Sequence, residues 1–303
     1  MTTLVVGRGL LGNAVVGALG ASAVPLNGAH WQDERATHEL LATAVRQHVR
    51  EHESWSVAWC AGAGVVGTAA EHLRRETRYL ETVLDAMRTA HGPGRFFLAS
   101  SAGGVHGAGT PAYIDESTPC APISDYGRNK VRQEELAVSW AGETGHTLLI
   151  GRISNLYGPG QALAKPQGLV SQAMARCILR RPIIVSVPEE TQRDFIFTDD
   201  AARRIAAWLQ QGTAHQPAVK LLVSGRPVTL SKVFRVVHAV TGIEPRLIRR
   251  ITVTSALQPR YLRFRSVTMP EVDLAPARVL EVGAKQTWDA MLRGYGRAGL
   301  HLP

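Results

Sequence analysis

The feature that most constrains the fold is a glycine-rich turn near the start of the chain, Gly7-Arg8-Gly9-Leu10-Leu11-Gly12. The apolar residues 3–6 before it are typical of a short buried strand, and the pattern after it, through about residue 20, is typical of a helix. Between a strand and a helix, the first glycine permits a tight turn and the second lets the backbone approach a pyrophosphate. The third lets the helix pack close to the strand. Because a helix N-terminus also offers free amides to phosphates, the segment predicts a dinucleotide site contacted by Gly7, Arg8, Gly9, Leu10, Leu11 and Gly12.

Strands and helices alternate over the first 150 residues. Further strands are predicted at 23–26, 56–60, 95–101 and 147–152, and helices at 36–50, 69–90 and 126–140. Such alternation implies a parallel sheet with helices on both faces, which binds its ligands at the carboxyl ends of the strands. The predicted fold class is therefore α/β, a Rossmann-type doubly wound parallel sheet.

The last third of the chain has a different pattern. Helices are predicted at 169–181 and 230–241 and strands at 183–187 and 219–223, with frequent Pro and Gly between them. Residues 195–210 look like a strand and a helix that return to the first domain. We therefore predict a dinucleotide-binding domain over 1–165, to which 190–225 returns, and a smaller substrate-binding subdomain over most of 166–303.

Composition and charge restrict the class of protein. No stretch of about 18 apolar residues is present, so no membrane span is expected. The net charge of +9 suits an anionic small-molecule ligand, while the scattered basic residues accompany no nucleic-acid motif. Cys60, Cys120 and Cys177 are widely spaced, which predicts neither disulfides nor a metal site. Because the apolar N-terminus lacks a basic segment, we expect a cytoplasmic protein without a signal peptide.

The end of the second predicted strand bears on the choice of cofactor. That strand ends Pro25-Leu26-Asn27-Gly28, without the carboxylate that usually binds the adenosine 2′-hydroxyl of NAD. Arg8 lies in the glycine turn, where a guanidinium could bind a 2′-phosphate. We therefore predict NADP(H) in preference to NAD(H), with Asn27 as a further cofactor contact.

A second motif supplies acid–base chemistry. Tyr126-Gly127-Arg128-Asn129-Lys130 begins a predicted helix, and a spacing of four places Tyr126 and Lys130 on one face. A phenol has a pKa of ~10, and a nearby ammonium lowers it. Tyr126 could then move a hydroxyl proton while hydride moves to or from a nicotinamide. A strand-end hydroxyl in the loop Ser100-Ser101-Ala102-Gly103-Gly104 would hold the substrate carbonyl, and we assign this role to Ser101.

Five sequence blocks occur in an order that resembles a known family. They are the glycine turn, the loop 100–107, the Tyr-Lys motif, Arg152 to Gly160, and Gln192 to Asp200. Together these blocks resemble the NAD-dependent epimerase/dehydratase branch of the extended short-chain dehydrogenases. The resemblance implies an enzyme with a Rossmann fold, a small C-terminal substrate domain and a nucleotide-diphosphate sugar as substrate.

The resemblance also implies roles for individual residues. Tyr126 would be the acid–base group and Lys130 its partner on the nicotinamide ribose. Asn155 and Arg193 would bind the substrate's diphosphate and nucleotide. Further cofactor contacts are assigned to Ser100 and to Ala61 and Gly62, which follow the family's fourth strand, and His106 is assigned to the substrate side.

The chain departs from the family pattern at several positions. Strict alignment places Ala102 rather than Ser101 on the catalytic hydroxyl. His106 replaces the usual tyrosine of its loop, and we expect a surface side chain rather than a catalytic one. The glycine motif is GxGxxG instead of the commoner GxxGxxG. Related enzymes often have Asn near Glu76, and here the run Arg74 to Arg78 predicts a solvated helix face.

Several functions fit these features. A 4-keto-sugar reductase and a C4 epimerase use the same Tyr/Lys chemistry, and the features of Asn27 and Arg8 favour the reductase. Dehydration is disfavoured because no carboxylate adjoins the catalytic hydroxyl. An NADPH-dependent ketoreductase of a non-sugar metabolite and a non-catalytic dinucleotide-binding regulator are the alternatives. A homodimer through helices 69–90 and 126–141 and a monomer are both compatible with the sequence.

Overall fold

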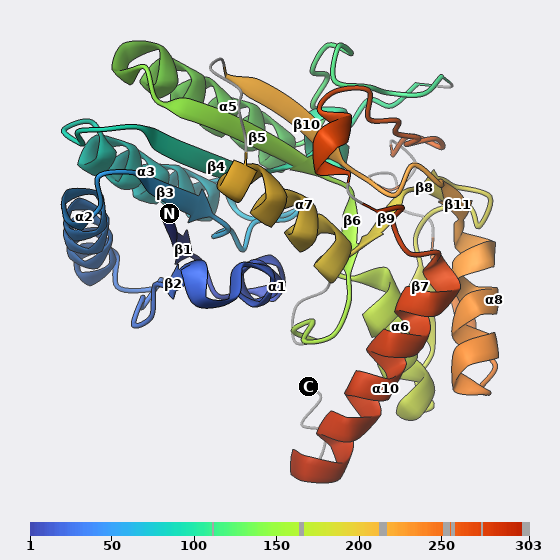
Figure 1. Cartoon of the computed structure of the whole chain (residues 1–303). Coiled ribbons are helices and arrows are strands. Elements are labelled where there is room, and N and C mark those ends of the chain that lie inside the picture. The colour runs from blue at the N-terminus through green and yellow to red at the C-terminus, as the bar shows by residue number, and fades with distance from the viewer. Residues whose placement is uncertain are drawn as a thin grey trace.

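A six-stranded parallel sheet forms the centre of the N-terminal part of the molecule (Figure 1). The computed structural model describes residues 1–110, 112–163, 167–211, 217–250, 255, 258–273 and 275–298. The strand order is β10-β5-β4-β3-β1-β2, and every neighbouring pair is parallel. The strands are β1 (Thr2–Val6), β2 (Ala23–Pro25), β3 (Trp55–Trp59), β4 (Gly94–Ser101), β5 (Thr147–Ile153) and β10 (Ala218–Leu222).

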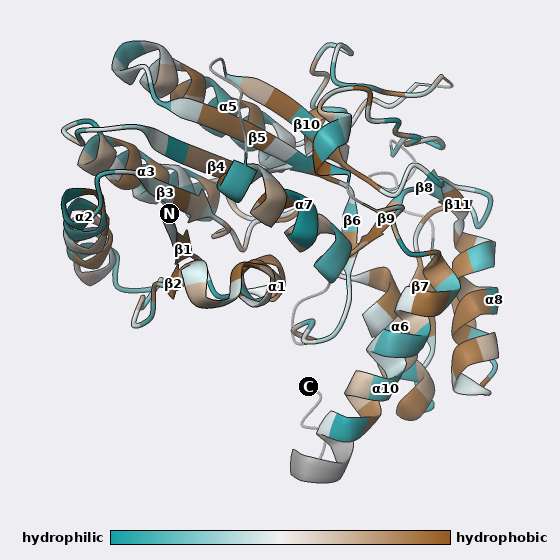
Figure 2. Cartoon of the chain, viewed as in Figure 1, coloured by the Kyte–Doolittle hydropathy of each residue, from teal (hydrophilic) through white to brown (hydrophobic). Residues whose placement is uncertain are grey.

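Helices cover both faces of this sheet. One layer consists of α2 (Glu34–Glu51), α3 (Ala70–Met87) and α5 (Asp125–Thr144), and α3 packs against both of the others. The other layer consists of α1 (Leu10–Leu19) and α7 (Thr198–Gln211), which pack on each other. Each layer encloses its own buried apolar cluster, and Figure 2 shows the hydrophobic strands between the two layers. The predicted doubly wound α/β fold is therefore confirmed.

The chain reverses direction across the sheet at β1. β1 lies between β2 and β3. The connection from β1 to β2 runs through α1 on one face, and the connection from β2 to β3 runs through α2 on the other. In open α/β sheets ligands bind outside the carboxyl ends of the strands at such a reversal. The strand before Ala61 and Gly62, predicted to be the family's fourth strand, is β3. It is the third strand in this chain because residues 26–54 contribute α2 and no strand.

The remaining elements build a second apolar core beside the sheet (Figure 1). It is formed mainly by α6 (Leu169–Ile178), α8 (Leu230–Thr241) and α10 (Leu280–Ala298), and α10 was not predicted from the sequence. Short strand pairs complete this part: β6 (Asn155–Tyr157) with β9 (Phe195–Phe197), β7 (Ile183–Val185) with β12 (Leu247–Arg249), and β8 (Gln192–Arg193) with β11 (Val228–Thr229). Two 3-10 turns (Gly20–Ser22 and Pro270–Val272) and the four-residue helix α4 (Ala102–Val105) are the other regular elements among the described residues. The domain limits given above stay a prediction.

Two general properties follow from the described residues. No helix among them combines the length and the apolar character needed to cross a membrane. Cys60, Cys120 and Cys177 are all free thiols.

Candidate functional site

The glycine turn has the geometry that its spacing predicts. A Cβ built on Gly7, which has a φ of +96°, would lie 2.4 Å from the Ala61 nitrogen, so the turn packs directly on the segment after β3. A Cβ on Gly12 would lie 1.8 Å from the Gly7 carbonyl oxygen. A Cβ on Gly9 would meet nothing within 4 Å. Two glycines therefore serve close packing, while the backbone at Gly9 faces open space.

The first turn of α1 suits an anion. Gly9 is the N-cap of α1, and no side chain caps the helix. The amides of Leu10 and Leu11 are therefore available to phosphate oxygens, and the helix dipole favours negative charge there. These residues fit a dinucleotide, whose pyrophosphate would lie against the amides.

Arg8 extends from the turn toward the end of β2. Its guanidinium donates to the side-chain oxygens of Asn13 (2.7 Å) and Asn27 (3.1 Å). Asn13 in turn donates to the Arg8 carbonyl (3.0 Å). Arg8 and Asn27, assigned to the cofactor separately, thus form one exposed cluster, and no carboxylate of the described residues pairs with Arg8.

Tyr126 lies at the start of α5, at the same edge of the sheet. Ser124 caps the helix through a hydrogen bond from the Gly127 amide. Because α5 leads into β5, its first turn lies at the carboxyl edge, where β1, β3 and β4 also end. The Lys130 ammonium lies 6.0 Å from the centre of the Tyr126 ring. Within the part of the chain that the structure describes, the half-buried Tyr126 makes no hydrogen bond through its hydroxyl.

Lys130 is buried and paired with a carboxylate from α3. Its ammonium donates to Glu76 Oε1 (3.0 Å) and to Gln133 Oε1 (2.9 Å). Gln133 also donates to Glu76 Oε1 (3.3 Å), and the Gly64 amide donates to Glu76 Oε2 (3.3 Å). The side chains of Lys130 and Glu76 are only 7% and 11% exposed.

The pair controls its own ionisation. Burial alone would lower the pKa of the Lys130 ammonium, but the adjacent Glu76 carboxylate, together with Tyr126 and Glu134, outweighs burial and the pKa is raised. Burial likewise opposes the charge on Glu76, but Lys130 and the hydrogen bonds from Gln133 and Gly64 together outweigh it, and the pKa of Glu76 is lowered. Both groups are therefore charged at neutral pH.

Ser101 lies beside Tyr126, across Gly104. Ser101 ends β4 and caps α4, where its hydroxyl accepts from the Gly104 amide (3.1 Å). A Cβ on Gly104 would lie 2.9 Å from the Tyr126 ring and 3.2 Å from Ser101 Oγ. Ala102, the alternative in strict alignment, is fully buried in an apolar cluster with Ile114 and Leu221. The structure thus brings Ser101, not Ala102, to Tyr126.

Ser100 and His106 belong to a buried network under the site. Ser100 donates to Glu134 Oε1 (2.5 Å), and Arg152 binds both oxygens of Glu134 (2.7 and 3.2 Å). Arg152 also contacts His106 Nε2 (3.2 Å) and Cys120 Sγ (3.1 Å). His106 is 2% exposed, so the expectation of a surface side chain is wrong. The Ser100 hydroxyl is likewise committed to Glu134, which leaves the Ser100 backbone for the cofactor.

Gly62 adjoins the same site. It has a φ of +145°, and a Cβ there would lie 2.9 Å from Glu76 Oε1. Ala61 packs on Gly7, as described above. Both residues assigned to the cofactor therefore lie between the glycine turn and the Glu76–Lys130 pair.

Asn155 at the start of β6 and Arg193 in β8 lie near the junction of the sheet with the second core. Asn155 donates to the Asp194 carbonyl oxygen through its side-chain amide (2.8 Å) and its backbone (3.2 Å). The fully buried Asp194 carboxylate accepts from Ser154 (2.6 Å) and Ser224 (2.8 Å) and fixes this junction. Arg193 donates to the Gln192 carbonyl (2.8 Å), and burial lowers its pKa to about 10. No described carboxylate pairs with the half-buried Arg193.

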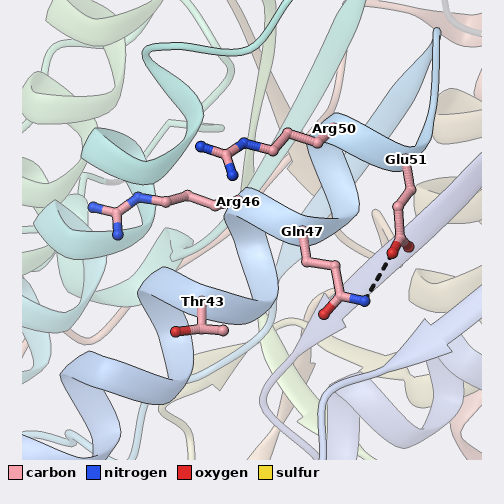
Figure 3. A pocket seen from close by; sticks show the side chains of 5 residues that line it. All are labelled: Thr43, Arg46, Gln47, Arg50 and Glu51. Carbon is pink, nitrogen blue, oxygen red and sulfur yellow. Dashed lines mark hydrogen bonds between the residues drawn. The ribbon is translucent and has the colours of Figure 1, made fainter.

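One surface depression lies elsewhere (Figure 3). It is lined by Thr43, Arg46, Gln47, Arg50 and Glu51 along one face of α2, with a hydrogen bond from Gln47 to Glu51 (2.7 Å). These exposed residues precede β3 and so lie toward the amino edge of the sheet. This depression takes no part in the candidate site.

The comparisons with known proteins decide the family. Residues 4–221 match the model of the NAD dependent epimerase/dehydratase family. The chain belongs to this family. The predicted resemblance to the NAD-dependent epimerase/dehydratase family is thus confirmed.

Individual relatives agree with this assignment. A dTDP-L-rhamnose 4-epimerase of Burkholderia thailandensis is 29% identical over 191 residues, 59% of this chain and 50% of the relative. An Escherichia coli dTDP-4-dehydro-6-deoxyglucose reductase is 27% identical over 48% of this chain and 45% of the relative. The matches thus span half or less of these curated relatives. The crystal structure of a Thermotoga maritima UDP-glucose 4-epimerase with UDP-glucose has a TM-score of 0.81 at 20% identity, covering 97% of this chain and 99% of that chain.

Several site residues were missed from the sequence. Glu76 was assigned to a solvated helix face, and the structure corrects this, because it faces Lys130 across the interface of α3 and α5. Its signal was its position three residues after Leu73 and four before Leu80, on the apolar stripe of α3. Glu134 follows Lys130 by four residues on the buried face of α5 and could have been recognised in the same way.

Proposed function

We propose that this chain is an NAD(P)-dependent oxidoreductase of a nucleotide-diphosphate sugar, working as a 4-keto-sugar reductase through Tyr126 and Lys130. The observation that carries the proposal is the Tyr126 hydroxyl. It makes no hydrogen bond within the described residues, and it belongs to a ring that lies between Lys130 and the Ser101–Gly104 turn. A phenol so placed is available to a substrate oxygen.

The residues divide the chemistry between them. When bound, the cofactor supplies the hydride and is oxidised as the keto carbon is reduced to a carbinol. Tyr126 donates the proton that the carbinol oxygen requires and regains a proton from solvent. Ser101 donates a hydrogen bond to the same oxygen and orients the carbonyl. Lys130 holds the nicotinamide ribose with the N–H that Glu76 and Gln133 leave free.

Arg193 and Asn155 are proposed to bind the substrate's diphosphate. A half-buried guanidinium without a carboxylate partner is costly unless a ligand compensates its charge. A diphosphate supplies that charge and accepts hydrogen bonds from both side chains. The net charge of +9 also favours the binding of a negatively charged substrate.

We propose NADP(H) as the cofactor, although the family is named for NAD. The Arg8–Asn27 cluster at the end of β2 supports this choice, since it offers a cation and an amide where the adenosine ribose would lie. A fluorescence titration should show tighter binding of NADPH than of NADH, and Arg8→Ala should remove the difference. Equal or tighter binding of NADH to the unaltered protein would contradict the preference.

The direct test of the function is a substrate comparison. The protein is mixed with NADPH and dTDP-4-dehydro-6-deoxyglucose, and oxidation of NADPH is followed by absorbance. A parallel reaction with UDP-glucose and NAD measures formation of the C4 epimer, the activity in the name of the Thermotoga relative. Turnover in the first reaction supports the reductase, and turnover in the second alone would replace it by an epimerase. Thermal shift with nucleotide diphosphates tests the sugar class, because stabilisation by none of them would favour a non-sugar ketoreductase.

We also propose a homodimer through α3 and α5. These two helices pack side by side, and Val138 on α5 is 43% exposed. Sedimentation equilibrium with Val138→Glu as the dissociating variant tests the assembly. A monomer in the unaltered protein would rule it out.

A further inference from the structure

A buried carboxylate lies in direct contact with the proposed catalytic lysine. Glu76 accepts from the Lys130 ammonium at 3.0 Å, and the two side chains are almost completely shielded from solvent. A lysine that is meant to favour a phenolate acts through its positive charge. In this chain that charge has a negative partner, closer than the Tyr126 ring, whose centre lies 6.0 Å away.

The carboxylate is held in place from several sides. The Gly64 amide donates to one oxygen, while Lys130 and Gln133 donate to the other. Thr77 beside it accepts from Gln133 (3.4 Å) and donates to Asn129 (2.9 Å). Glu76 therefore has little freedom to move away from Lys130.

We propose that Glu76 is a positioning residue that neutralises Lys130 and thereby keeps Tyr126 protonated at neutral pH, which adapts the site to proton donation. The inference rests on the proposed function and gives it a direction. A reductase needs a phenol that donates a proton, whereas an oxidation begins with a phenolate that accepts one. Neutralisation of the cation removes the main influence that would form the phenolate.

Among the described residues, no uncompensated charge from the other packed elements contacts Lys130 or Glu76. From α5, Glu134 faces Lys130 but is bound to Arg152, which compensates it. From the loop after β3, residues 61–69 carry no ionisable side chain. From β4 and α4 the neighbours are Ser101 and Gly104, which are uncharged, and His106, whose pKa burial lowers to about 4. On α3, Thr77 is neutral, so Glu76 is the one carboxylate that contacts Lys130 among the described residues.

The test measures the ionisation of Tyr126 directly and needs no substrate. The protein is labelled with ¹³C at tyrosine Cζ, and the Tyr126 resonance is assigned by its loss in Tyr126→Phe. In Glu76→Gln, which keeps the hydrogen-bond acceptor but removes the charge, the midpoint of the Tyr126 titration should fall by about one pH unit. Glu71→Gln is the matched control, an equal loss of charge on an exposed part of α3, and should leave the midpoint unchanged. An unchanged midpoint in Glu76→Gln would overturn the proposal.

A second variant guards against misfolding of the first. The double variant Glu76→Gln/Lys130→Met contains neither buried charge. If the two charges cancel in the unaltered protein, Tyr126 titrates in the double variant within a few tenths of a pH unit of its original midpoint. A rise of about one pH unit would show that Lys130 acts as a free cation and would contradict the proposal.

The pH profile of turnover gives an independent readout. With NADPH and dTDP-4-dehydro-6-deoxyglucose, the loss of activity at alkaline pH should begin about one pH unit lower in Glu76→Gln than in the unaltered protein. A purely structural role would lower activity without moving the profile. If no substrate is turned over but the Tyr126 midpoint moves as expected, the proposed reaction fails while the role of Glu76 stands. If turnover is found and the midpoint stays, only the role of Glu76 fails.

Discussion

Two buried ion pairs lie one turn apart along α5, and they differ in the hydrogen-bond donors that they leave without a partner. Lys130 pairs with Glu76 beside Tyr126, and Glu134 pairs with Arg152 beneath Ser100. Arg152 binds both oxygens of Glu134 and also reaches His106 and Cys120, so each of its three side-chain nitrogen atoms has a partner. Lys130 uses two of three N–H bonds, and the neighbouring Tyr126 hydroxyl uses none.

This difference distinguishes a pair with a structural role from a pair that belongs to the candidate site. A buried ion pair whose charged nitrogen atoms all have partners fixes one conformation and leaves little for a ligand. The Lys130–Glu76 pair lies beside hydrogen-bond donors without a protein partner, the Tyr126 hydroxyl and the open amides of the glycine turn, which remain available to a ligand. The Glu134–Arg152 pair thus supports the candidate site from below. The Lys130–Glu76 pair and Tyr126 form the part of the site that can contact a ligand, called here its working surface.

The largest expected effect is on turnover when the working surface is altered. Tyr126→Phe removes the proton donor and should lower kcat by about 10²- to 10⁴-fold. Its stability should change little, because the hydroxyl has no partner to lose. Steady-state kinetics and urea unfolding measure the two quantities, with the exposed Tyr113→Phe as control. Retention of full activity would mean that another group moves the proton.

Substitutions in the Glu134–Arg152 pair should instead lower the stability of the protein. Glu134→Ala leaves Arg152 buried without its carboxylate and should cost about 3–5 kcal/mol of the free energy of unfolding. Glu135→Ala, the adjacent and exposed carboxylate, should cost less than about 0.5 kcal/mol. Urea unfolding monitored by circular dichroism compares the two. Equal losses would show that the network contributes no special stability.

His106 should make the stability of the protein sensitive to acidic pH. Arg152 can only donate, so His106 Nε2 must accept and the ring is neutral. Burial, and next the charge of Arg152, lower the pKa of His106 to about 4, against about 6.5 in an unfolded chain. The unfolded state therefore binds the proton first, and stability falls as the pH drops from about 6.5 to 4, by up to about 3 kcal/mol. His106→Asn should flatten this part of the stability profile, and a profile identical to that of the unaltered protein would refute the assignment.

The sequence predicted those parts of the molecule whose cause is local. Gly7 and Gly12 pack closely because of their spacing within one turn, and Tyr126 and Lys130 share a face because one turn of helix separates them. The same holds for most elements of the parallel sheet, whose alternation is a property of neighbouring residues.

What could not be predicted depends on partners distant in the chain. Glu76 meets Lys130 across 54 residues, and Asp194 meets Ser154 across 40. A charge in an arginine-rich helix segment is usually solvated, and only the packing of α3 on α5 turns Glu76 inward. The choice between Ser101 and Ala102 likewise depended on α4, which was not predicted and which turns Ala102 into an apolar cluster.

The smallest expected effect is on substrate binding, when Arg193 on the proposed substrate side is replaced. Unlike the buried Lys130 it is a half-buried cation, with unused donors and no carboxylate that compensates it among the described residues. Arg193→Met should therefore raise KM for the nucleotide-diphosphate sugar by about 10-fold, the value of one charged hydrogen bond of about 1.5 kcal/mol. It should leave stability equal or higher, because an uncompensated charge is removed from the interior. The exposed Arg235→Met controls for net charge, and a loss of stability in Arg193→Met with KM unchanged would place Arg193 with the scaffold instead of the site.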